Sequence, residues 1–157
     1  MANGDFPDLF SELLFEMTLQ VAPATAVGAT PSGKRYIAYV TGGTFEGPRL
    51  KGRVLPGGGD WVIQRPDHVF QLDVRITLET DDGAMIYSTY RGARHGSREV
   101  MRRIASGQSV QADEYYFRIT PYFETGSEKY GWLGGIVSVG IGQDRPGGVT
   151  YRVYQII

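Results

Sequence analysis

The alternation of side chains from Val69 to Thr80 constrains the fold more than any other feature of this sequence. From Phe70 to Glu79 apolar and polar residues alternate at every position, and the two sets are Phe70, Leu72, Val74, Ile76 and Leu78 against Gln71, Asp73, Arg75, Thr77 and Glu79. A period of two residues predicts a β-strand, because successive side chains of a strand point to opposite faces of a sheet. The hairpin signal Asp81-Asp82-Gly83 then predicts an antiparallel return over residues 84–93.

Shorter patterns of the same kind, bounded by glycine, proline or aspartate, recur along the chain. They predict further strands over residues 9–22, 34–41, 62–65, 114–124, 131–142 and 149–157. The composition agrees, because 22 glycines and 10 tyrosines in 157 residues favour short strands and tight turns over long helices. Residues 44–56 are predicted to be irregular, and the run Pro56-Gly57-Gly58-Gly59 to be a loop.

One helix is predicted, from the N-cap residue Ser97 to the terminating Gly107. Its apolar stripe consists of Val100, Met101 and Ile104. We expect this helix to cover one end of the sheet.

The predicted elements make an all-β fold. It is a single antiparallel up-and-down β-barrel of about eight to ten strands with one short helix near residues 97–106. Closure into a barrel is favoured because it removes exposed strand edges. A chain of 157 residues fits one domain, here residues 9–157, preceded by a loose N-terminal tail over residues 1–8.

The composition argues against several classes of partner and chemistry. A net charge of −1 and a pI near 6.1 offer no broad surface for nucleic acid or an anionic membrane. No apolar run reaches roughly 18 residues and the N-terminus lacks a signal-peptide pattern, so a cytoplasmic protein is expected. There is no cysteine for disulfides or thiol catalysis, and His68 and His95 lack metal-site spacing. Without a phosphate-binding or dinucleotide motif, we expect neither a metal nor a cofactor.

Four segments together resemble a known family. In chain order they are GGTFEGPRLKGRVLPGGGDW, LDVRITLETDDGAMIY, EYYFRITPYFETGSEKYGWLGG and VTYRVYQI. They resemble the DUF3237 family, also called UPF0311, over nearly the whole chain from about Leu13 onward. The resemblance implies a small, single, lipocalin-like antiparallel β-barrel. One departure is that Trp132-Leu133-Gly134 stands where family members commonly read Trp-Leu-Asn.

The orientation of the strand faces decides which residues form a site, and alternation alone leaves two orientations open. In one, the aliphatic faces fill the barrel and the polar faces meet water. In the other, the polar faces line a cavity that holds a ligand. We favour the second, because the polar faces are poor in lysine and rich in arginine, tyrosine and acidic residues, which suit partly buried hydrogen bonding.

In that orientation, polar residues of separate hairpins converge on one site. The catalytic candidates are Asp60, Arg75, Arg118 and Glu124. The ligand-binding candidates are Trp61, Asp73, Tyr116 and Trp132. Asp60 or Glu124 would transfer a proton, and Arg75 and Arg118 would hold developing negative charge. In the alternative, Asp60 caps a turn, Trp61 seals the barrel end and the other charges form exposed ion pairs.

These residues predict a small-molecule-binding barrel. It would be a cofactor-free isomerase, lyase or cyclase that performs acid–base chemistry on a carbonyl- or carboxylate-bearing organic substrate. The alternative is a non-catalytic, lipocalin-like carrier of a small apolar or aromatic ligand, whose aliphatic faces line the cavity; a weaker third is a scaffold subunit. The expected partner is a small organic ligand, neither nucleic acid nor membrane is expected, and a homodimer is left open.

Overall fold

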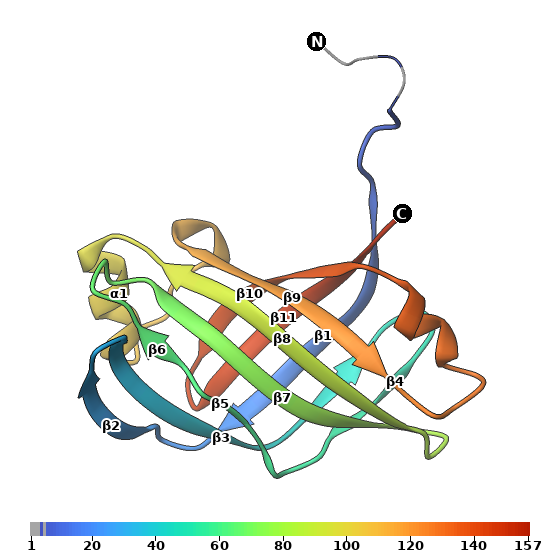
Figure 1. The fold of residues 1–157 in the computed structure, drawn as a ribbon, viewed down its shortest axis with the longest axis horizontal. Coiled ribbons are helices and arrows are strands. Elements are labelled where there is room, and N and C mark those ends of the chain that lie inside the picture. The colour runs from blue at the N-terminus through green and yellow to red at the C-terminus, as the bar shows by residue number, and fades with distance from the viewer. Residues whose placement is uncertain (1–3, 5) are drawn as a thin grey trace.

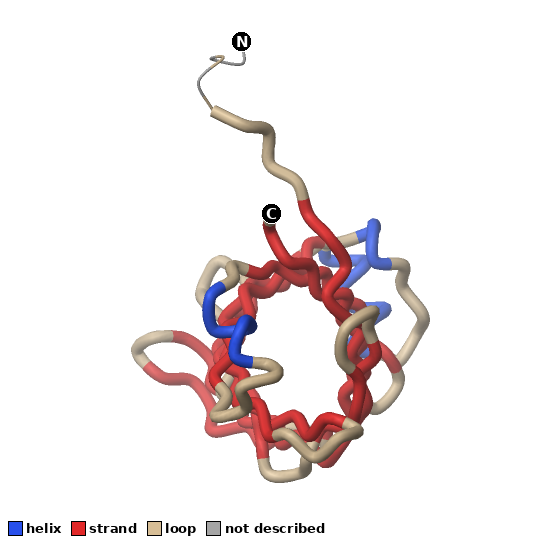
Figure 2. Tube along the Cα trace, turned by 90° about the vertical axis from the view of Figure 1, so that its right-hand side faces the viewer, coloured by secondary structure: helices blue, strands red, loops and turns tan. Residues whose placement is uncertain are grey.

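The strands close into an antiparallel β-barrel (Figures 1 and 2). The computed structural model describes residue 4 and residues 6–157. Its strands are β1 (Ser11–Val21), β2 (Thr25–Thr30), β3 (Gly33–Glu46), β4 (Lys51–Val54), β5 (Gly58–Asp60), β6 (Ile63–Gln64), β7 (Phe70–Thr80), β8 (Met85–His95), β9 (Tyr116–Glu124), β10 (Ser138–Arg145) and β11 (Gly148–Ile156). Its helices are α1 (Arg98–Ala105) and the 3-10 helices η1 (Ala112–Glu114) and η2 (Gly131–Gly135). The predicted β-barrel with one short helix is confirmed.

Eight strand positions form the closed ring. Hydrogen bonds join neighbours in the order β1-β11-β10-β9-β8-β7-β4-β3, and β3 also pairs with β1, which closes the barrel. The short strands β5 and β6 continue the position of β4, because both pair with β3 and β7. From β7 to β11 each strand pairs with the next one in the chain, as an up-and-down barrel requires.

Three short strands lie where the sequence pattern predicted none. They are β2, β4 and β5, of which β4 lies in the predicted irregular segment and β5 in part of the predicted glycine loop. A Cβ at Gly58 would overlap the carbonyl oxygen of Arg75, so glycine there permits close approach of β5 to β7 instead of a turn. In the opposite sense, residues 131–135 form η2 and not the start of the predicted strand, which begins at Ser138.

The N-terminal segment leaves the barrel beside the C-terminus (Figure 1). Of the predicted loose tail over residues 1–8, residues 1–3 and 5 lie outside the described residues. Phe6 is 83% exposed and Leu9 is 78% exposed, so neither contributes to the core. The barrel proper begins near Phe10, whose carbonyl oxygen accepts a hydrogen bond from the backbone N–H of Ile157 at 3.0 Å.

Side chains fill the end of the barrel where η2 lies. In Figure 1, η2 is the red-orange coil at the right. Phe15 makes edge-to-face contacts with Phe45 and Phe123, with ring centroids 5.5 and 5.9 Å apart. Fully buried aliphatic residues complete this core, among them Ile76, Leu78, Ile86, Leu133 and Val153. This apolar burial is the main contribution to the stability of the barrel.

Helix α1 lies at the opposite end of the barrel, at the left of Figure 1. Its N-cap is Ser97, whose hydroxyl accepts a hydrogen bond from the backbone N–H of Val100 at 3.1 Å. Val100 is buried, and Met101 and Ile104 pack against the core from the same face. Gly107 follows the helix with a φ of +80°, which confirms it as the predicted stop. Within the described residues, no helix has the length and apolar character needed to cross a membrane.

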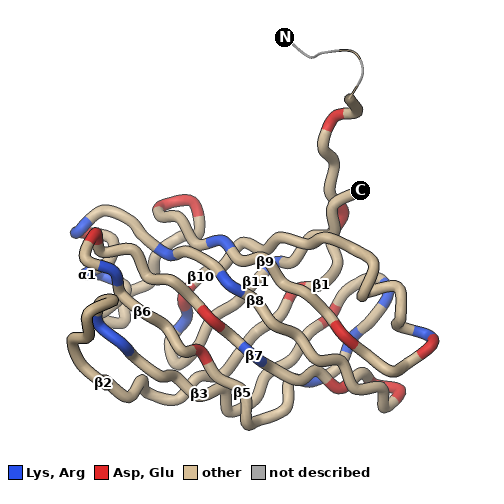
Figure 3. The backbone as a smooth tube through the Cα atoms, viewed as in Figure 1, with Lys and Arg blue, Asp and Glu red and all other residues tan. Residues whose placement is uncertain are grey.

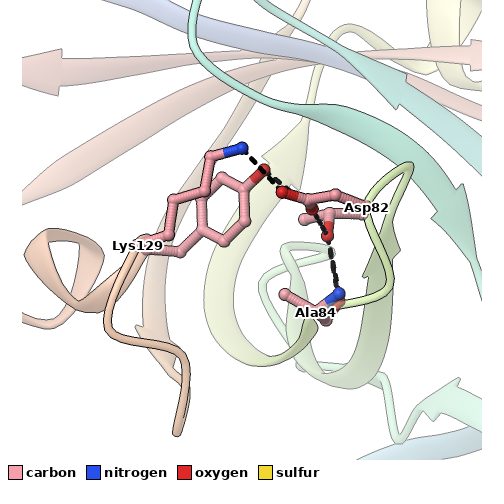
Figure 4. Close-up of polar contacts among 5 residues, drawn as sticks. Asp82, Ala84 and Lys129 are labelled. Atoms are coloured by element: carbon pink, nitrogen blue, oxygen red, sulfur yellow. Dashed lines mark hydrogen bonds and ion pairs between the residues drawn. The ribbon is translucent and has the colours of Figure 1, made fainter.

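A polar cluster joins the β7–β8 turn to the segment before η2 (Figure 4). Asp82 accepts hydrogen bonds from Lys129 Nζ at 2.6 Å, from the Thr80 hydroxyl at 2.5 Å and from the Tyr130 hydroxyl at 2.9 Å. Thr80 in turn accepts a hydrogen bond from the backbone N–H of Ala84 at 2.8 Å. The hydrogen bond from Lys129 is the main reason that the pKa of Asp82 lies well below its usual range. The turn is therefore held by a carboxylate that is charged at neutral pH.

Removing the hydroxyl of Tyr130 tests this cluster. Tyr130 is buried and its ring packs in the core, so Tyr130→Phe removes only the hydrogen bond to Asp82. We expect the free energy of unfolding, measured by urea denaturation, to fall by about 1 kcal/mol. Tyr122→Phe is the control, because the Tyr122 side chain is exposed on the barrel surface. Removing its hydroxyl should change the free energy of unfolding by less than about 0.5 kcal/mol. Equal effects in the two variants would contradict a stabilising role for the cluster.

Candidate functional site

The end of the barrel interior nearest α1 is hollow. A cavity of about 430 Å³ lies there, within the range of roughly 300–1,000 Å³ typical of small-molecule sites. Aliphatic residues form most of its wall, among them Leu19, Ala38, Val40, Leu72, Val74 and Val149. Ala24 and Gly147 line the cavity and are also exposed, so they mark its mouth. Half of the barrel is therefore packed solid and the other half has room for a ligand.

The inward faces of the strands are aliphatic, so the orientation favoured in the sequence analysis is wrong. On β7, Leu72 and Val74 are buried and line the cavity, whereas Gln71 and Arg75 are exposed on the opposite face. Apolar burial decides this orientation, because each enclosed aliphatic side chain contributes about 1.5–3 kcal/mol. The alternating charged residues of β7 lie on the exposed side of the strand. Figure 3 shows residues of both signs interspersed along the backbone.

Asp60 is one of two acidic residues that line the cavity in the described part of the chain, the other being Asp144. It ends β5, pairs with Ala38 on one side and Val74 on the other, and lines the cavity. Its Oδ1 accepts a hydrogen bond from the backbone N–H of Asp73 at 3.0 Å. Asp60 therefore lines the cavity and also binds a backbone N–H group. The sequence analysis had treated a position in the site and a backbone-capping role as alternatives for this residue.

The environment of Asp60 changes its protonation. Burial raises the pKa of Asp60 from 3.8 to about 6, against the hydrogen bond from the backbone of Asp73 and the charges of Arg94 and Arg35, which lower it. The negative charge of Asp73 raises it further. A carboxyl group with such a pKa exists in both forms near neutral pH, so it can donate or accept a proton.

A second polar group, at the α1 end of the cavity, consists of Arg94, Asp144 and Tyr115. Arg94 Nη1 donates to Asp144 Oδ1 at 2.6 Å, and the Tyr115 hydroxyl donates to Asp144 Oδ2 at 2.9 Å. The backbone N–H of Asp144 donates to the Tyr115 hydroxyl at 2.7 Å. The guanidinium of Arg94 also lies over the rings of Phe70 and Phe117, at 4.6 and 5.7 Å. These contacts hold one arginine in a fixed position on the cavity wall.

The connection between β8 and β9 places Tyr115 in this group. It contains α1 and η1, and Arg103 of α1 donates to Glu114 of η1 at 2.8 Å. Tyr115 follows η1 directly, and burial raises the pKa of its hydroxyl, which stays protonated. The helix therefore supports the cavity end through Tyr115.

Two tyrosines form the inner part of the polar wall. The rings of Tyr90 and Tyr151 meet edge to face with centroids 5.4 Å apart, and both residues line the cavity. Burial raises the pKa of both hydroxyls, and the charge of Asp60 raises them further. The two hydroxyls influence each other, yet the Tyr90 hydroxyl makes no hydrogen bond with adequate geometry.

The structure brings only one of the predicted site residues, Asp60, to the cavity. Three of the others lie on the outer surface between β5 and β7. Arg75 pairs with Asp73 at 3.6 Å, and its guanidinium lies 5.3 Å from the centre of the Trp61 ring. These side chains form an exposed group of the kind weighed as the alternative in the sequence analysis.

The remaining predicted residues also lie away from the cavity. Arg118 and Tyr116 share the outer face of β9, with the guanidinium 5.0 Å from the ring, and Glu124 is exposed at the end of the same strand. Trp132 belongs to η2 at the other end of the barrel and lies 3.6 Å from the guanidinium of Arg49. Gly134, where the sequence departs from the family pattern, is in η2 as well and lines no part of the cavity.

The sequence analysis missed the polar wall formed by Arg94, Asp144, Tyr90 and Tyr151. It also missed Tyr115, whose hydroxyl binds Asp144. One signal was present, because Ile86, Tyr90 and Arg94 have the same parity on β8 and the first two are buried. An arginine that continues an inward face is a candidate ligand group. The sequence analysis did not include Arg94 among the candidate residues. Asp144 carries no such signal, since its hairpin pattern is that of an ordinary turn.

Comparisons with known proteins agree with this fold. The family described as protein of unknown function (DUF3237) matches residues 11–156. A UPF0311 protein of Rhodopseudomonas palustris is 34% identical over 151 residues, covering 96% of this chain and 99% of the relative. The crystal structure of the corresponding Rhodopseudomonas palustris protein superposes with a TM-score of 0.92 and covers 97% of this chain and 100% of that one.

Two further relatives widen the comparison. The crystal structure of a β-barrel-like protein from Acinetobacter baumannii is 42% identical, with a TM-score of 0.85 and coverage of 98% of this chain and 99% of that chain. A hydroalkoxylation enzyme of Penicillium herquei is 26% identical over 133 residues, covering 82% of this chain and 71% of the relative. The match of the family along nearly the whole barrel, together with the bacterial relatives, shows that the chain belongs to the DUF3237 family, also named UPF0311.

Proposed function

We propose that this barrel is a cofactor-free enzyme that performs acid–base chemistry on a small, largely apolar organic substrate, with Asp60 as the proton-transferring group. The observation that supports this proposal is a carboxyl group in an aliphatic cavity, with its pKa raised to about 6 by burial. General acid–base catalysis is most effective when the pKa of the catalytic group lies near the working pH. A purely structural aspartate would have no need of a desolvated position.

The relative from Penicillium herquei suggests the reaction class. It is named a hydroalkoxylation enzyme, and hydroalkoxylation adds an O–H group across a carbon–carbon double bond. Such a reaction is an isomerisation when both groups belong to one molecule, so it needs no oxidant, reductant or co-substrate. A largely apolar cavity in which one carboxyl group has a raised pKa suits an alkene, since alkenes offer few hydrogen-bonding atoms.

The step can be written for Asp60 with atoms and electrons in balance. The neutral carboxyl group donates its proton to one alkene carbon, and the π electrons form the new C–H bond. The substrate hydroxyl oxygen forms the C–O bond to the other carbon. The Asp60 carboxylate then takes the proton from that oxygen, which restores the neutral acid. Tyr90, which lines the cavity on the same level as Asp60, supplies a hydrogen-bond donor for the substrate oxygen.

The test is cyclisation of a simple ortho-prenylated phenol to the corresponding chroman, followed by liquid chromatography. We expect turnover at acidic to neutral pH and a decline as the pH rises through about 6, because the neutral form of Asp60 is the active one. A rate no higher than without protein at every pH would contradict this reaction. Retention of the rate in Asp60→Asn would exclude Asp60 as the acid.

The second candidate is a carrier of an apolar ligand, which the aliphatic lining of the cavity favours. Both candidates need the cavity, so a substitution that fills it tests the assumption they share. Ala38 lines the cavity and pairs with Asp60. We expect Ala38→Phe to weaken binding of the neutral fluorescent probe N-phenylnaphthylamine by about tenfold or more, since the added ring occupies the ligand volume.

Two controls separate these candidates. Ala29→Phe adds the same ring on the exposed strand β2 and should leave probe binding unchanged. Asp60→Asn should leave probe binding intact in both schemes but remove turnover only in the enzyme. If Ala38→Phe binds the probe as the wild type does, the cavity is not the ligand site.

A further inference from the structure

Two residues of the cavity wall each carry a buried polar atom that makes no hydrogen bond of adequate geometry. These atoms are the Tyr90 hydroxyl and Arg94 Nε. Among the described residues the other buried side-chain atom of this kind is Arg103 Nε, which is not part of the cavity wall. Buried polar groups in native proteins are almost always paired, because an unpaired one loses its hydration without replacement. Two such atoms in one cavity wall therefore indicate that a bound ligand supplies their hydrogen-bond partners.

The two atoms lie at different depths. Tyr90 and Arg94 are four positions apart on β8, which separates their Cα atoms by about 13 Å. Tyr90 pairs with Val74, which pairs in turn with Asp60, so Tyr90 and Asp60 lie on the same level of the barrel. Arg94 pairs with Phe70 and lies next to the end of β8, where the chain leaves for α1. Arg94 is therefore nearer the end of the barrel and Tyr90 is deeper.

Arg94 is arranged to receive an anionic oxygen. Its Nη1 is already used by Asp144, and two aromatic rings fix the plane of the guanidinium, so Nε is a held donor with no acceptor. A charged N–H donor pairs best with a charged acceptor such as a carboxylate or a phenolate. The ligand therefore presents an ionised oxygen at this end.

Tyr90 is arranged to bind a second oxygen. It is 2% exposed, and its hydroxyl can both donate and accept. Asp60 shares this level, and the Tyr151 ring meets the Tyr90 ring edge to face. Both titratable groups interact electrostatically with Tyr90. A ligand hydroxyl or carbonyl oxygen would complete this group, whereas a purely hydrocarbon end would leave the hydroxyl unpaired.

We propose that the natural ligand has an apolar body with two oxygens, an ionised one bound by Arg94 near the mouth and a second one bound by Tyr90 beside Asp60. The proposal depends on the proposed use of this cavity as the site, but it does not depend on catalysis. It defines the substrate class as amphipathic oxyanions, of which unsaturated carboxylic acids and phenols are the simplest.

The test is a set of thermodynamic cycles with p-coumarate, which has a carboxylate and a phenol at opposite ends of a flat apolar body. Isothermal titration compares p-coumarate with cinnamate, which lacks the phenol, and with p-coumaramide, which lacks the charge. For the wild type we expect the missing phenol of cinnamate and the missing charge of p-coumaramide each to weaken binding about tenfold relative to p-coumarate. In Tyr90→Phe the phenol should no longer matter, and in Arg94→Lys the penalty for the amide should shrink, because the lysine is used by Asp144.

Controls keep this test decisive. Arg94→Met combined with Asp144→Asn removes both charges together, in case the lysine variant fails to fold, and should abolish the penalty for the amide. Tyr39→Phe, on the exposed side of β3, should behave as the wild type. A phenolic probe without a carboxylate, p-cresol, tests whether a phenolate replaces the carboxylate at Arg94; tight binding that Arg94→Lys weakens would show that it does.

The proposal is overturned if p-coumarate does not bind, or if cinnamate and the amide carry the same penalties in the variants as in the wild type. Its outcome is independent of turnover. Coupled binding without cyclisation of the prenylated phenol would refute the proposed reaction and support the two-oxygen ligand. Cyclisation of the prenylated phenol, with ligand penalties that Tyr90→Phe and Arg94→Lys leave unchanged, would support the proposed reaction and refute the two-oxygen ligand.

Discussion

Replacing Asp60 by asparagine is expected to slow the proposed cyclisation by about a hundred- to ten-thousand-fold, the usual contribution of a positioned acid or base. Asparagine keeps the shape of the side chain and an Oδ1 atom that accepts the hydrogen bond from the backbone of Asp73. It has no proton to donate to carbon. The measurement is the initial rate of chroman formation at a pH below 6, where the wild-type carboxyl group is mostly neutral.

Asp81→Asn is the matched control, because Asp81 is an exposed aspartate in the β7–β8 turn. It should keep the wild-type rate. A rate in Asp60→Asn within about tenfold of the wild type would be too small a loss for a general acid, and the proton donor would have to be sought elsewhere.

The same substitution is expected to stabilise the protein above pH 6. Because burial raises the pKa of Asp60 from 3.8 to about 6, folding favours the protonated form. This contribution to stability is complete below the unfolded pKa and is lost as the pH rises through the folded pKa. The loss amounts to about 3 kcal/mol, because each pKa unit corresponds to about 1.36 kcal/mol. Thermal unfolding should show Asp60→Asn as more stable than the wild type near pH 8 and no more stable near pH 4.

That pattern distinguishes a functional aspartate from a structural one. Arg94, Arg35 and Asp73 are the charged groups that act on Asp60, and their effects are included in its raised pKa. A carboxylate retained for stability would lose stability on neutralisation, since its favourable contacts would be removed. A variant less stable than the wild type near pH 8 would therefore contradict the desolvated position of Asp60.

Replacing Phe15 by alanine is expected to lower the free energy of unfolding by about 3–5 kcal/mol, the largest loss of stability we expect in this barrel. Phe15 is 1% exposed and contacts Phe45 and Phe123 edge to face in the filled half. Its removal leaves a void with no side chain free to occupy it. Urea denaturation of the purified variant measures the change.

Phe70→Ala is the matched control, because the same ring is removed from the wall of the cavity. Phe70 is only partly buried and borders space that is already empty, so its loss should be clearly smaller. Equal losses at the two positions would mean that the barrel has no division into a filled and a hollow half. A larger loss at Phe70 would point to the interaction of its ring with Arg94 as a main source of stability.

Much of the fold could be predicted from local pattern. The strict alternation over residues 70–79, the turn at Asp82-Gly83 and the capped helix after Ser97 all appear in the structure as predicted. Each depends on residues that are close together in the chain, where periodicity and capping act directly. The strands β4 and β5 escaped prediction, because their glycines serve close contact with β7, which is a property of the partner strand.

Of the candidate residues named from the sequence, Asp60 alone lies in the cavity wall, and the other polar residues of that wall were missed. Arg94 lies 50 residues from Asp144, and Tyr115 lies 29 residues from it, so their contact exists only after the barrel has closed in its register. Arg75 and Arg118 are residues of the type expected on a binding face, but they lie on the outer face of the barrel, beside exposed aromatic rings.

The sequence by itself determined the long strands, the order of their hairpins and the sorting of each of them into an aliphatic and a polar face. Only the tertiary structure decided which face turns inward, where the interior stays empty and which distant side chains meet there. The physical reason is that a period of two assigns the residues of a strand to two faces but does not specify which face lies inside the closed barrel. That choice follows from the summed burial of aliphatic side chains from all strands at once.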